Sequence, residues 1–426
     1  MSSEHISLTP GQRAIGELPV FTELDSPEWG LDFDPLAEDL FSRDQQGLMR
    51  TPSGGTTDGS VFVYRNADLK TLTAHSALSN QPPDIFSRPF YEDGNSAVPG
   101  FQSLMSHSIF TMQPPAHGPA RQLVARRLTV KSVARFRETI ADFLETVIDD
   151  VAERREIDFR ADFTDHVMAG FWSAALGLSK AEADEACRLA ARVQVSNVFR
   201  PTSEQKADIN RSAVELLDYL SVTLAREIAK GEQDLIVELT AALADMGEVG
   251  RPDALEAHFG VSLLDGLHSL SSEIASVVHA LLRSEEHHAA VRADGCLVSQ
   301  AFHEGARLHP AVTLTQRHAL TDFEYAGVAI PEGTAVTMAW LMGNRDPDAF
   351  ERPNEYELER SNRPQTTFGG GFYICPGRNV VKMLCEAVLT ALTAPSVEIV
   401  ATGDVSFVPG SALHEVQRMP VSIRRH

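Results

Sequence analysis

A cysteine in a glycine-rich segment near the carboxyl terminus is the residue of this sequence best placed to carry out chemistry. The segment from Thr367 to Arg378 reads TFGGGFYICPGR and comes directly before an apolar, helical pattern. Glycines let the backbone approach another group closely, and a Pro-Gly step favours a tight turn. Cys375 therefore stands just before a helix, where amide donors and the helix dipole favour a thiolate over a thiol. A thiolate can serve as a nucleophile, a redox sensor or a metal ligand.

Other interpretations of this segment are weaker. Glycine-rich loops also hold phosphates, but this one lacks the Lys-Ser/Thr step that follows a phosphate-binding loop. The sequence has four cysteines and no CxxC pair, which excludes a disulfide scaffold and a zinc-finger framework. A cysteine held between aromatic and turn residues favours haem-thiolate ligation, in which the thiolate is an axial ligand of iron.

With this loop, the sequence resembles the cytochrome P450 family. The haem loop of that family reads FGxGxHxCxG, and the matching residues here are Phe368, Gly369, Gly371, Cys375 and Gly377. The resemblance implies that the cofactor is haem b and that Cys375 is its axial metal ligand. Tyr373 replaces the histidine of the loop, and its phenol can still donate one hydrogen bond to a haem propionate.

Three further motifs, HxxxR, ExxR and NRDP, occur in the order that the family has them. Glu304 and Arg307 match the family's ExxR, and residues three apart on a helix share a face, so they can form a buried ion pair. Glu355 falls where many members carry an arginine that joins this pair, and Arg360 is nearby but out of register. The sequence NRDP at 344–347 is also found in the family.

Cationic or hydrogen-bonding residues suited to the haem propionates form the next group. His117 and Arg121 lie one helical turn apart in PPAHGPAR and are similar to the family's HxxxR. Arg317 matches a third propionate-binding position. The resemblance therefore implies that His117, Arg121, Arg317 and Tyr373 bind the haem together with Cys375.

A long helix is predicted over 254–283, because this stretch has no proline and is apolar on nearly every side. The family's oxygen-activating run falls on Asp265 to Ser269, where Gly266 keeps the notch for O2. His268 replaces the usual acid and Ser269 the usual threonine. Histidine relays protons near neutral pH and serine keeps a hydroxyl, so a relay through these residues can persist. There are two alternatives. Either the reaction is one that needs no proton relay, or the two replacements are neutral drift and substrate or water relays the protons instead.

The remaining pattern predicts mostly helices with short strands near the carboxyl terminus. A stretch over 81–115 is irregular and rich in proline and aromatic residues, which favours a lid or binding loop. The other predictions are a strand at 60–65, helices over 66–75, 116–152, 160–310 (with a break near 199–201) and 379–393, and β-type runs at 323–330, 335–340 and after 393.

The composition excludes several classes of protein. The chain has 426 residues, a formal net charge of −22 and 43% hydrophobic residues, enough for a large core. The negative charge argues against binding to nucleic acid or to an anionic membrane surface. The first residues, MSSEHISLTPGQ, show no signal peptide, and no apolar run is long enough to span a membrane, so the sequence predicts a cytoplasmic protein.

One stretch inverts this negative charge. Between Gly94 and Arg137 there is no acidic residue, whereas six basic residues fall there. The pattern is typical of a solvated basic helix face or of a docking surface for an acidic partner. For docking, the residues expected near the haem loop are Arg126, Arg127, Lys131 and Lys382.

The expected fold is mostly α, a single large helical domain of the cytochrome P450 type with a small β-rich lobe, covering 56–426 after an irregular segment over 1–55. The resemblance implies a monooxygenase of secondary metabolism, a monomer that oxidises a small or medium, largely apolar substrate. Electrons would come from a ferredoxin-type donor and its reductase. The alternatives are oxidative coupling or rearrangement without oxygen insertion, and a non-catalytic haem- or gas-binding protein.

Overall fold

Helices dominate the chain, as the sequence predicts. The computed structural model describes residues 12–26, 29–43, 47–52, 59–87, 99–106, 108–230, 266, 269–361 and 364–426. Within these ranges, no helix is both long enough and apolar enough to cross a membrane.

The α-helices are α1 (Asp34–Arg43), α2 (Asn66–Thr73), α3 (Pro83–Ser87), α4 (Pro99–Ser106), α5 (His117–Arg127), α6 (Val130–Val133), α7 (Arg137–Ala152), α8 (Asp165–Leu176), α9 (Lys180–Val193), α10 (Ser203–Lys230), α13 (Glu285–Ala293), α14 (Val298–Leu308), α15 (Trp340–Gly343) and α16 (Arg378–Leu392). Residues 269–282 are also helical.

The strands form one five-stranded sheet and three smaller ones. The order in the larger sheet is β1 (Leu48–Arg50), β2 (Val61–Val63), β8 (Ala335–Met338), β5 (Thr315–Ala319) and β3 (Leu78–Ser79). The smaller sheets pair β6 (Phe323–Tyr325) with β7 (Val328–Ile330), β10 (Ser406–Phe407) with β11 (Val416–Arg418), and β12 (Pro420–Arg425) with both β4 (Ile157–Asp158) and β9 (Val397–Ala401).

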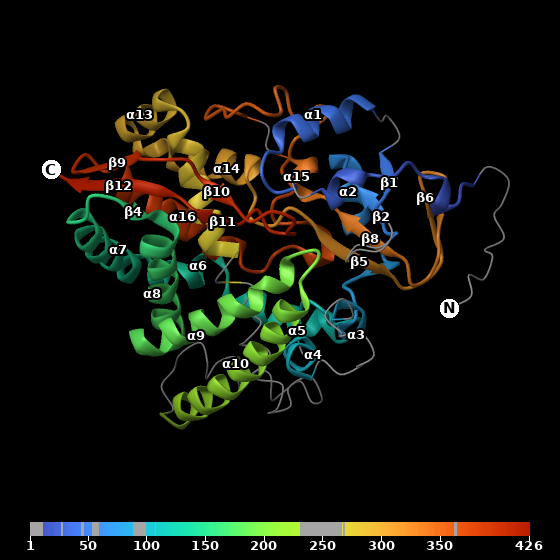
Figure 1. The fold of residues 1–426 in the computed structure, drawn as a ribbon, viewed down its shortest axis with the longest axis horizontal. Helices are drawn as coiled ribbons and strands as arrows, with labels where there is room; N and C mark the ends of the chain where they lie inside the picture. The colour runs from blue at the N-terminus through green and yellow to red at the C-terminus, as the bar shows by residue number, and fades with distance from the viewer. Residues whose placement is uncertain are drawn as a thin grey trace.

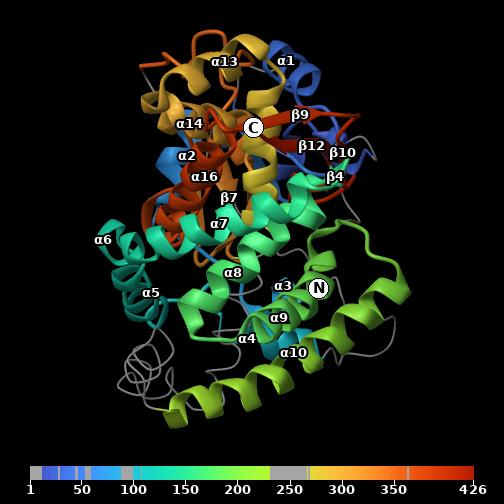
Figure 2. The ribbon, with the colours of Figure 1, turned by 90° about the vertical axis from the view of Figure 1, so that its left-hand side faces the viewer.

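Helices α7 to α10 and the larger sheet occupy different sides of the molecule. Figure 1 shows strands β1, β2, β5 and β8 on the right, beside α1 and α2, with α7, α8, α9 and α10 on the left and below. In Figure 2, α7 and α8 run across the molecule between α14 above and α9 and α10 below. The largest buried apolar cluster joins these helices to helix 269–282 and to α16.

The first 55 residues contain more regular structure than the sequence indicates. The described part includes α1 and β1, and β1 pairs antiparallel with β2, with Met49 opposite Phe62. Phe21, Trp29 and Phe62 belong to one buried cluster. The expectation of an irregular segment is therefore wrong for these parts, because aromatic side chains spread between turn residues pack on the sheet. The domain boundary at residue 55 stays a prediction.

The predicted helix over 116–152 is broken into α5, α6 and α7. Leu128 ends α5, and the Thr129 hydroxyl accepts a hydrogen bond from the amide of Ser132, which starts a new helix. A threonine that caps a helix favours a chain break that hydrophobic periodicity alone does not reveal. The break near 199–201 is confirmed, since α10 begins at Ser203.

The proline-rich stretch over 81–115 is partly helical, with α3 and α4 inside it. Phe86 packs against both Phe101 and Phe110, and Phe101 is fully buried. The backbone of Gly100 approaches that of Asn210 on α10 so closely that an added Cβ would lie 2.3 Å from the Asn210 carbonyl oxygen. These described parts of the stretch pack on the helical core, and its role as a lid stays a prediction.

Candidate active site

The Cys375 loop is held by backbone hydrogen bonds and by two arginines. The Cys375 amide donates to the carbonyl oxygen of Phe368 at 2.9 Å, which closes the loop before α16. Arg378 donates to the Cys375 carbonyl oxygen at 3.1 Å, and Arg121 donates to the carbonyl oxygen of Ile374. Cys375 is half-buried in this cationic setting.

The other three cysteines lie in settings that keep a thiol protonated. Burial raises the pKa of Cys187 and of Cys385. The hydrogen bond and charge of Asp294 raise the pKa of exposed Cys296. Cys375 by contrast interacts with the charge of Arg121, so it has the electrostatic surroundings that a thiolate needs.

Gly371 in this loop is required because the backbone of another segment lies very close to it. Gly371 has φ of +57°, and an added Cβ would lie 2.1 Å from the carbonyl oxygen of Thr73, the last residue of α2. A side chain at this position would therefore separate the loop from α2. The sequence predicts that the glycines approach some group closely, and at Gly371 that group is the end of α2.

The predicted propionate-binding residues gather on one side of the loop. The ring of His117 lies 4.6 Å from that of Tyr373, and the Arg317 guanidinium lies 5.0 Å from the Tyr373 ring centre. Tyr373 donates to the Ser79 hydroxyl at 3.0 Å. Because β3 and β5 are neighbouring strands, they bring Ser79 and Arg317 to the same region.

Among the described residues, no carboxylate forms an ion pair with the arginines of this group. Arg317 is 5% exposed, its Nε has no hydrogen-bond partner in the described structure, and its Nη1 donates to Thr315 and to the Gln316 carbonyl oxygen. Burial lowers the pKa of Arg317 to about 10, so it stays charged at pH 7. Burial and the charges of Arg121 and Arg317 lower the pKa of His117 to about 4. His117 is therefore a neutral donor or acceptor at pH 7, and the group fits a ligand that carries carboxylates.

Glu304 accepts hydrogen bonds from two arginines beneath the loop. Arg307 binds both its carboxylate oxygens, at 3.0 and 2.9 Å, and Arg360 Nε binds one of them at 3.0 Å. Burial opposes ionisation of Glu304, but these hydrogen bonds and charges hold its pKa below the ordinary value. The expectation that Arg360 is out of register is wrong. The loop places its side chain beside Glu304, whereas Glu355 points to solvent, with 61% of its side chain exposed.

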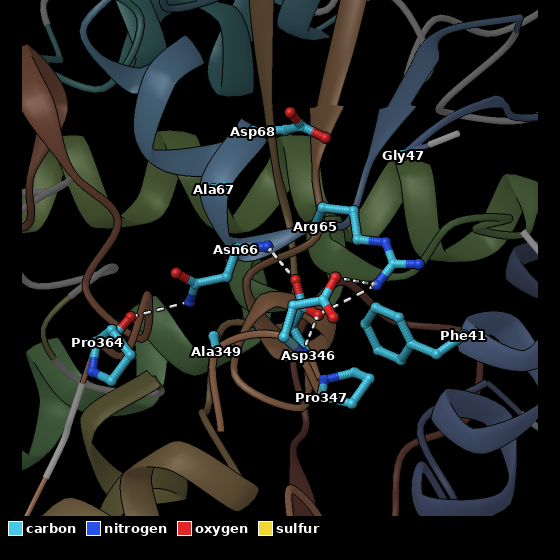
Figure 3. A pocket seen from close by; sticks show the side chains of 11 residues that line it. Phe41, Gly47, Arg65, Asn66, Ala67, Asp68, Asp346, Pro347, Ala349 and Pro364 are labelled. Carbon is cyan, nitrogen blue, oxygen red and sulfur yellow. Dashed lines mark hydrogen bonds and ion pairs between the residues drawn. The ribbon is translucent and has the colours of Figure 1, made fainter. Parts of the chain in front are cut away.

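The NRDP segment ties the loop to three other elements. Asn344 accepts a hydrogen bond from the Thr366 amide at 2.6 Å and donates to the Thr367 hydroxyl at 2.9 Å, just before the glycines. Arg345 donates to the last carbonyl of α14, that of Leu308. Figure 3 shows Asp346 accepting from the amide of Asn66, at the start of α2, at 2.8 Å. The segment therefore positions the loop, α14 and α2 relative to one another.

A surface hollow of about 900 Å³ lies beside this segment (Figure 3). Its lining includes Arg65, Asp68, Asp346 and Asp348, and none of its residues belongs to the loop 367–378. Arg65 pairs with Asp346 at 3.3 Å and with Asp348 at 3.2 Å, so the charges in the hollow already have partners. The hollow is separate from the Cys375 site.

The predicted oxygen-activating run is described only in part. His268 lies outside the described residues, whereas Gly266 and Ser269 are helical. A Cβ at Gly266 would lie 2.6 Å from the ring of Trp172 on α8, which gives this glycine a reason in helix packing. Its role as an oxygen notch, and the roles of His268 and Ser269, stay predictions.

One buried acid of the same helix did not stand out in the sequence. Glu273 is 4% exposed and accepts a hydrogen bond from the Ala311 amide at 2.6 Å. It lies four residues after Ser269, so the two share a helix face. Counting in threes and fours from Ser269 is the signal that finds it.

Comparison with known proteins identifies relatives of the chain. The model of the family described as Cytochrome P450 matches residues 268–393, which contain Glu304, Arg307, Arg317 and Cys375. The chain is 28% identical to cyclomarin C epoxidase of Salinispora arenicola, over 82% of this chain and 87% of that protein. It is 27% identical to nocardicin C N-oxygenase of Nocardia uniformis subsp. tsuyamanensis, over 91% of this chain and 97% of that protein.

A solved structure shares the fold. The structure of epothilone B-bound cytochrome P450epoK superposes on the chain with a TM-score of 0.82 and 20% sequence identity, and the match covers 95% of this chain and 99% of that one. The predicted mostly helical fold with a small β-rich part is confirmed by this similarity.

Proposed function

We propose that the chain is a monooxygenase of the cytochrome P450 family that binds haem b through Cys375. Its substrate is a small or medium-sized, largely apolar organic compound, which it oxidises with O2. One observation carries the proposal. Of the chain's four cysteines, all of which the structure describes, Cys375 is the one beside two arginines in a loop anchored to the buried Glu304 network. Oxygen insertion is favoured over coupling because the two relatives are named as an epoxidase and an N-oxygenase.

Thiolate-bound haem supplies the oxidising power, using two electrons and two protons per O2. The residues of this chain bind and orient the group. Arg121 and Arg317 provide the cations for its propionates, and His117 and Tyr373 provide neutral donors. The buried Nε of Arg317, which has no hydrogen-bond partner in the described part of the chain, supports this assignment. A buried charge without a counter-ion destabilises the protein until an anion pairs with it.

The substitution Arg317→Met should therefore have effects of opposite sign on haem binding and on the haem-free protein. Loss of a charge-assisted hydrogen bond, worth about 1.5–3 kcal/mol, should weaken haem binding about 10- to 100-fold. The haem-free protein should become more stable, since an unpaired buried charge is removed. Haem transfer to an acceptor protein and urea unfolding measure the two effects. Haem affinity equal to that of the wild type would contradict the assignment.

We further propose a cytoplasmic monomer that receives electrons from an acidic, ferredoxin-type donor and its reductase. Asn379, at the start of α16, donates to the carbonyl oxygen of Leu128 at 2.7 Å, which joins the end of α5 to the Cys375 loop. Exposed Arg126 and Lys131 flank this junction. Lys382 is less suited to docking than the sequence suggests, because it binds Ser299 at 2.7 Å and Glu386 at 2.9 Å.

Turnover under ¹⁸O2 tests the function. Reconstitution uses an acidic ferredoxin, its reductase and NAD(P)H, with a substrate chosen by optical binding screens of aromatic, terpenoid and fatty-acid compounds. One labelled atom should enter each product molecule, and unlabelled product would contradict the monooxygenase assignment. Reversing Arg126 and Lys131 to Glu should lower the reduction rate about 10-fold at low salt without changing the label. If the reduction rate changes neither with these substitutions nor with salt, the proposed docking surface is excluded, and the monooxygenase assignment is not affected.

A further inference from the structure

Helix 269–282 carries a stripe of polar residues through the apolar core. Ser272 and Glu273 follow Ser269 by three and four residues, and Ser276 follows those two by four and three. The four residues therefore share one face of the helix. Ser272 and Ser276 are 0% exposed and Glu273 is 4% exposed. The helix otherwise contributes buried apolar residues to the core: Leu270, Ile274, Ala275, Val277, Val278 and Leu281.

Three buried polar atoms of this stripe have no hydrogen-bond partner among the described residues. The hydroxyls of Ser272 and Ser276 and the Oε1 atom of Glu273 are buried and have no hydrogen bond in the described structure. Each unsatisfied buried polar atom costs about 1–3 kcal/mol, and proteins meet such demands with ordered water. Three such atoms within five residues of one helix face indicate a short row of polar groups that water molecules can bridge. We call this row, from Ser269 through Ser272 and Glu273 to Ser276, the file.

Glu273 is the group of the file that can hold a proton. Its Oε2 atom accepts the hydrogen bond from the Ala311 amide, which leaves Oε1 for the file. Burial raises the pKa of Glu273 to about 8, and the Ala311 amide only partly offsets this effect. From α16, the thiol of Cys385 lies near enough that the carboxylate adds to the rise of its pKa. The carboxyl is therefore largely protonated at pH 7.

The C-terminal end of the stripe lies where helix 269–282 leaves the core. His279 follows Ser276 by three residues, and Arg283 follows His279 by four, so both continue the same face. His279 is half-buried, and burial with the charge of Arg283 lowers its pKa to about 4, so the imidazole is neutral at pH 7. A neutral imidazole can accept a proton at one nitrogen and release one from the other.

We propose that Glu273 is the proton reservoir for oxygen activation, passing protons along the file to Ser269 and regaining them from the His279 end. The inference rests on the proposed monooxygenase function. Its overall balance is RH + O2 + 2 H⁺ + 2 e⁻ → ROH + H2O, with the electrons supplied by the redox partner. For each proton delivered, the O–H bond of the Glu273 carboxyl breaks and a carboxylate remains. A proton from solvent then restores the carboxyl.

This arrangement places an ionisable group one turn after Ser269 and five residues after His268, the position at which the resemblance implies an acid. Residues four apart on a helix have Cβ atoms about 5–6 Å apart, so a single water can join the Ser269 and Glu273 side chains. Glu273 acts through Ser269, and it is a proton-storing and positioning residue that does not touch the reacting oxygen.

The substitution Glu273→Gln tests the role of the carboxyl proton separately from that of the hydrogen bond to the Ala311 amide. The glutamine carbonyl can still accept the Ala311 hydrogen bond, whereas the exchangeable proton is lost. Turnover should become uncoupled, with NAD(P)H consumed, peroxide released and the product rate about 100-fold lower. Glu273→Asp should restore part of the coupling. Ser271→Ala is the matched control, because Ser271 lies on another face and binds Thr164 and Asp165, and it should stay coupled.

A spectroscopic measurement on the resting protein needs no turnover. Infrared difference spectra should show a protonated carboxyl band at pH 7 that disappears with a midpoint near pH 8 in the wild type. The band should be absent in Glu273→Gln and present in Ser271→Ala. A carboxyl that ionises below pH 6 in the wild type would overturn the proposal.

The outcomes distinguish this proposal from the function on which it rests. Product without ¹⁸O label from the wild type would mean that the monooxygenase assignment fails. If the wild-type product is labelled but Glu273→Gln stays coupled, with the same dependence of turnover on pH as the wild type, the reservoir proposal is overturned. Glu273 would then only anchor the Ala311 amide. If Glu273→Gln does not fold, the double substitution Ser272→Ala, Ser276→Ala interrupts the file while Glu273 keeps its bond. Coupling unchanged in that variant would also overturn the proposal.

Discussion

Replacing Cys375 by serine is expected to remove the red-shifted Soret band of the reduced, carbon monoxide-bound protein completely. A serine hydroxyl is not an anionic donor at neutral pH. The cysteine, by contrast, lies beside Arg121 and three residues before α16 begins, where a thiolate is stabilised. The measurement is the difference spectrum after reduction with dithionite under carbon monoxide.

Cys385→Ser is the matched control for this prediction. Cys385 lies ten residues further along, inside α16, where burial raises its pKa. Its substitution should keep the band, although the protein should lose some stability because a hydroxyl replaces a buried thiol. A band that survives Cys375→Ser but not Cys385→Ser would show that the wrong cysteine has been assigned to the iron.

Local motifs made part of this site predictable from the sequence. The loop around Cys375 is contiguous, and the Glu304–Arg307 pair obeys helical spacing, so neither depends on how distant segments meet. The structure places both pairing partners as the spacing predicts, with Arg307 binding both oxygens of Glu304.

The third member of that network could not be placed by spacing. Residues 351–361 form no helix or strand, so their side chains follow no period. Arg360 reaches Glu304 because its guanidinium also binds the carbonyl oxygens of Glu351, Arg352 and Glu355, which wraps the loop around the side chain. Glu355 contributes its backbone oxygen here, and its carboxylate stays outside.

Tertiary contacts also decided features that composition suggested wrongly. The N-terminal segment has many turn residues, yet Phe21 stacks on Phe62 with ring centres 4.4 Å apart and becomes part of the core. Glu273 shows the opposite limit. A single acid in an apolar helix gives little signal on its own. Its burial, and an oxygen without a partner among the described residues, emerge from the packing of α16 and the Ala311 segment around it.

The substitution Arg360→Met should lower the free energy of unfolding by about 3–5 kcal/mol. Removing one partner of a buried ion pair leaves the charge of Glu304 with less compensation, and three loop carbonyls lose a hydrogen bond. Glu355→Gln is the control, because that side chain is exposed and its pair with Arg352 is worth about 0–1 kcal/mol. Urea unfolding at pH 7 measures both. A loss for Arg360→Met no larger than that for Glu355→Gln would contradict the assignment.

The effect of Arg360→Met on the free energy of unfolding should depend on pH, because the charge of Arg360 acts on the ionised carboxyl of Glu304. The arginines hold the pKa of Glu304 below its ordinary value of 4.5, so the ionised carboxyl stabilises the native state above that pH. This stabilisation is lost as pH falls below 4.5 and the carboxyl takes up a proton in both states. The stability difference between wild type and Arg360→Met should therefore narrow as pH falls below 4.5. A difference independent of pH would mean that Arg360 acts through its loop hydrogen bonds and that its charge on Glu304 contributes little.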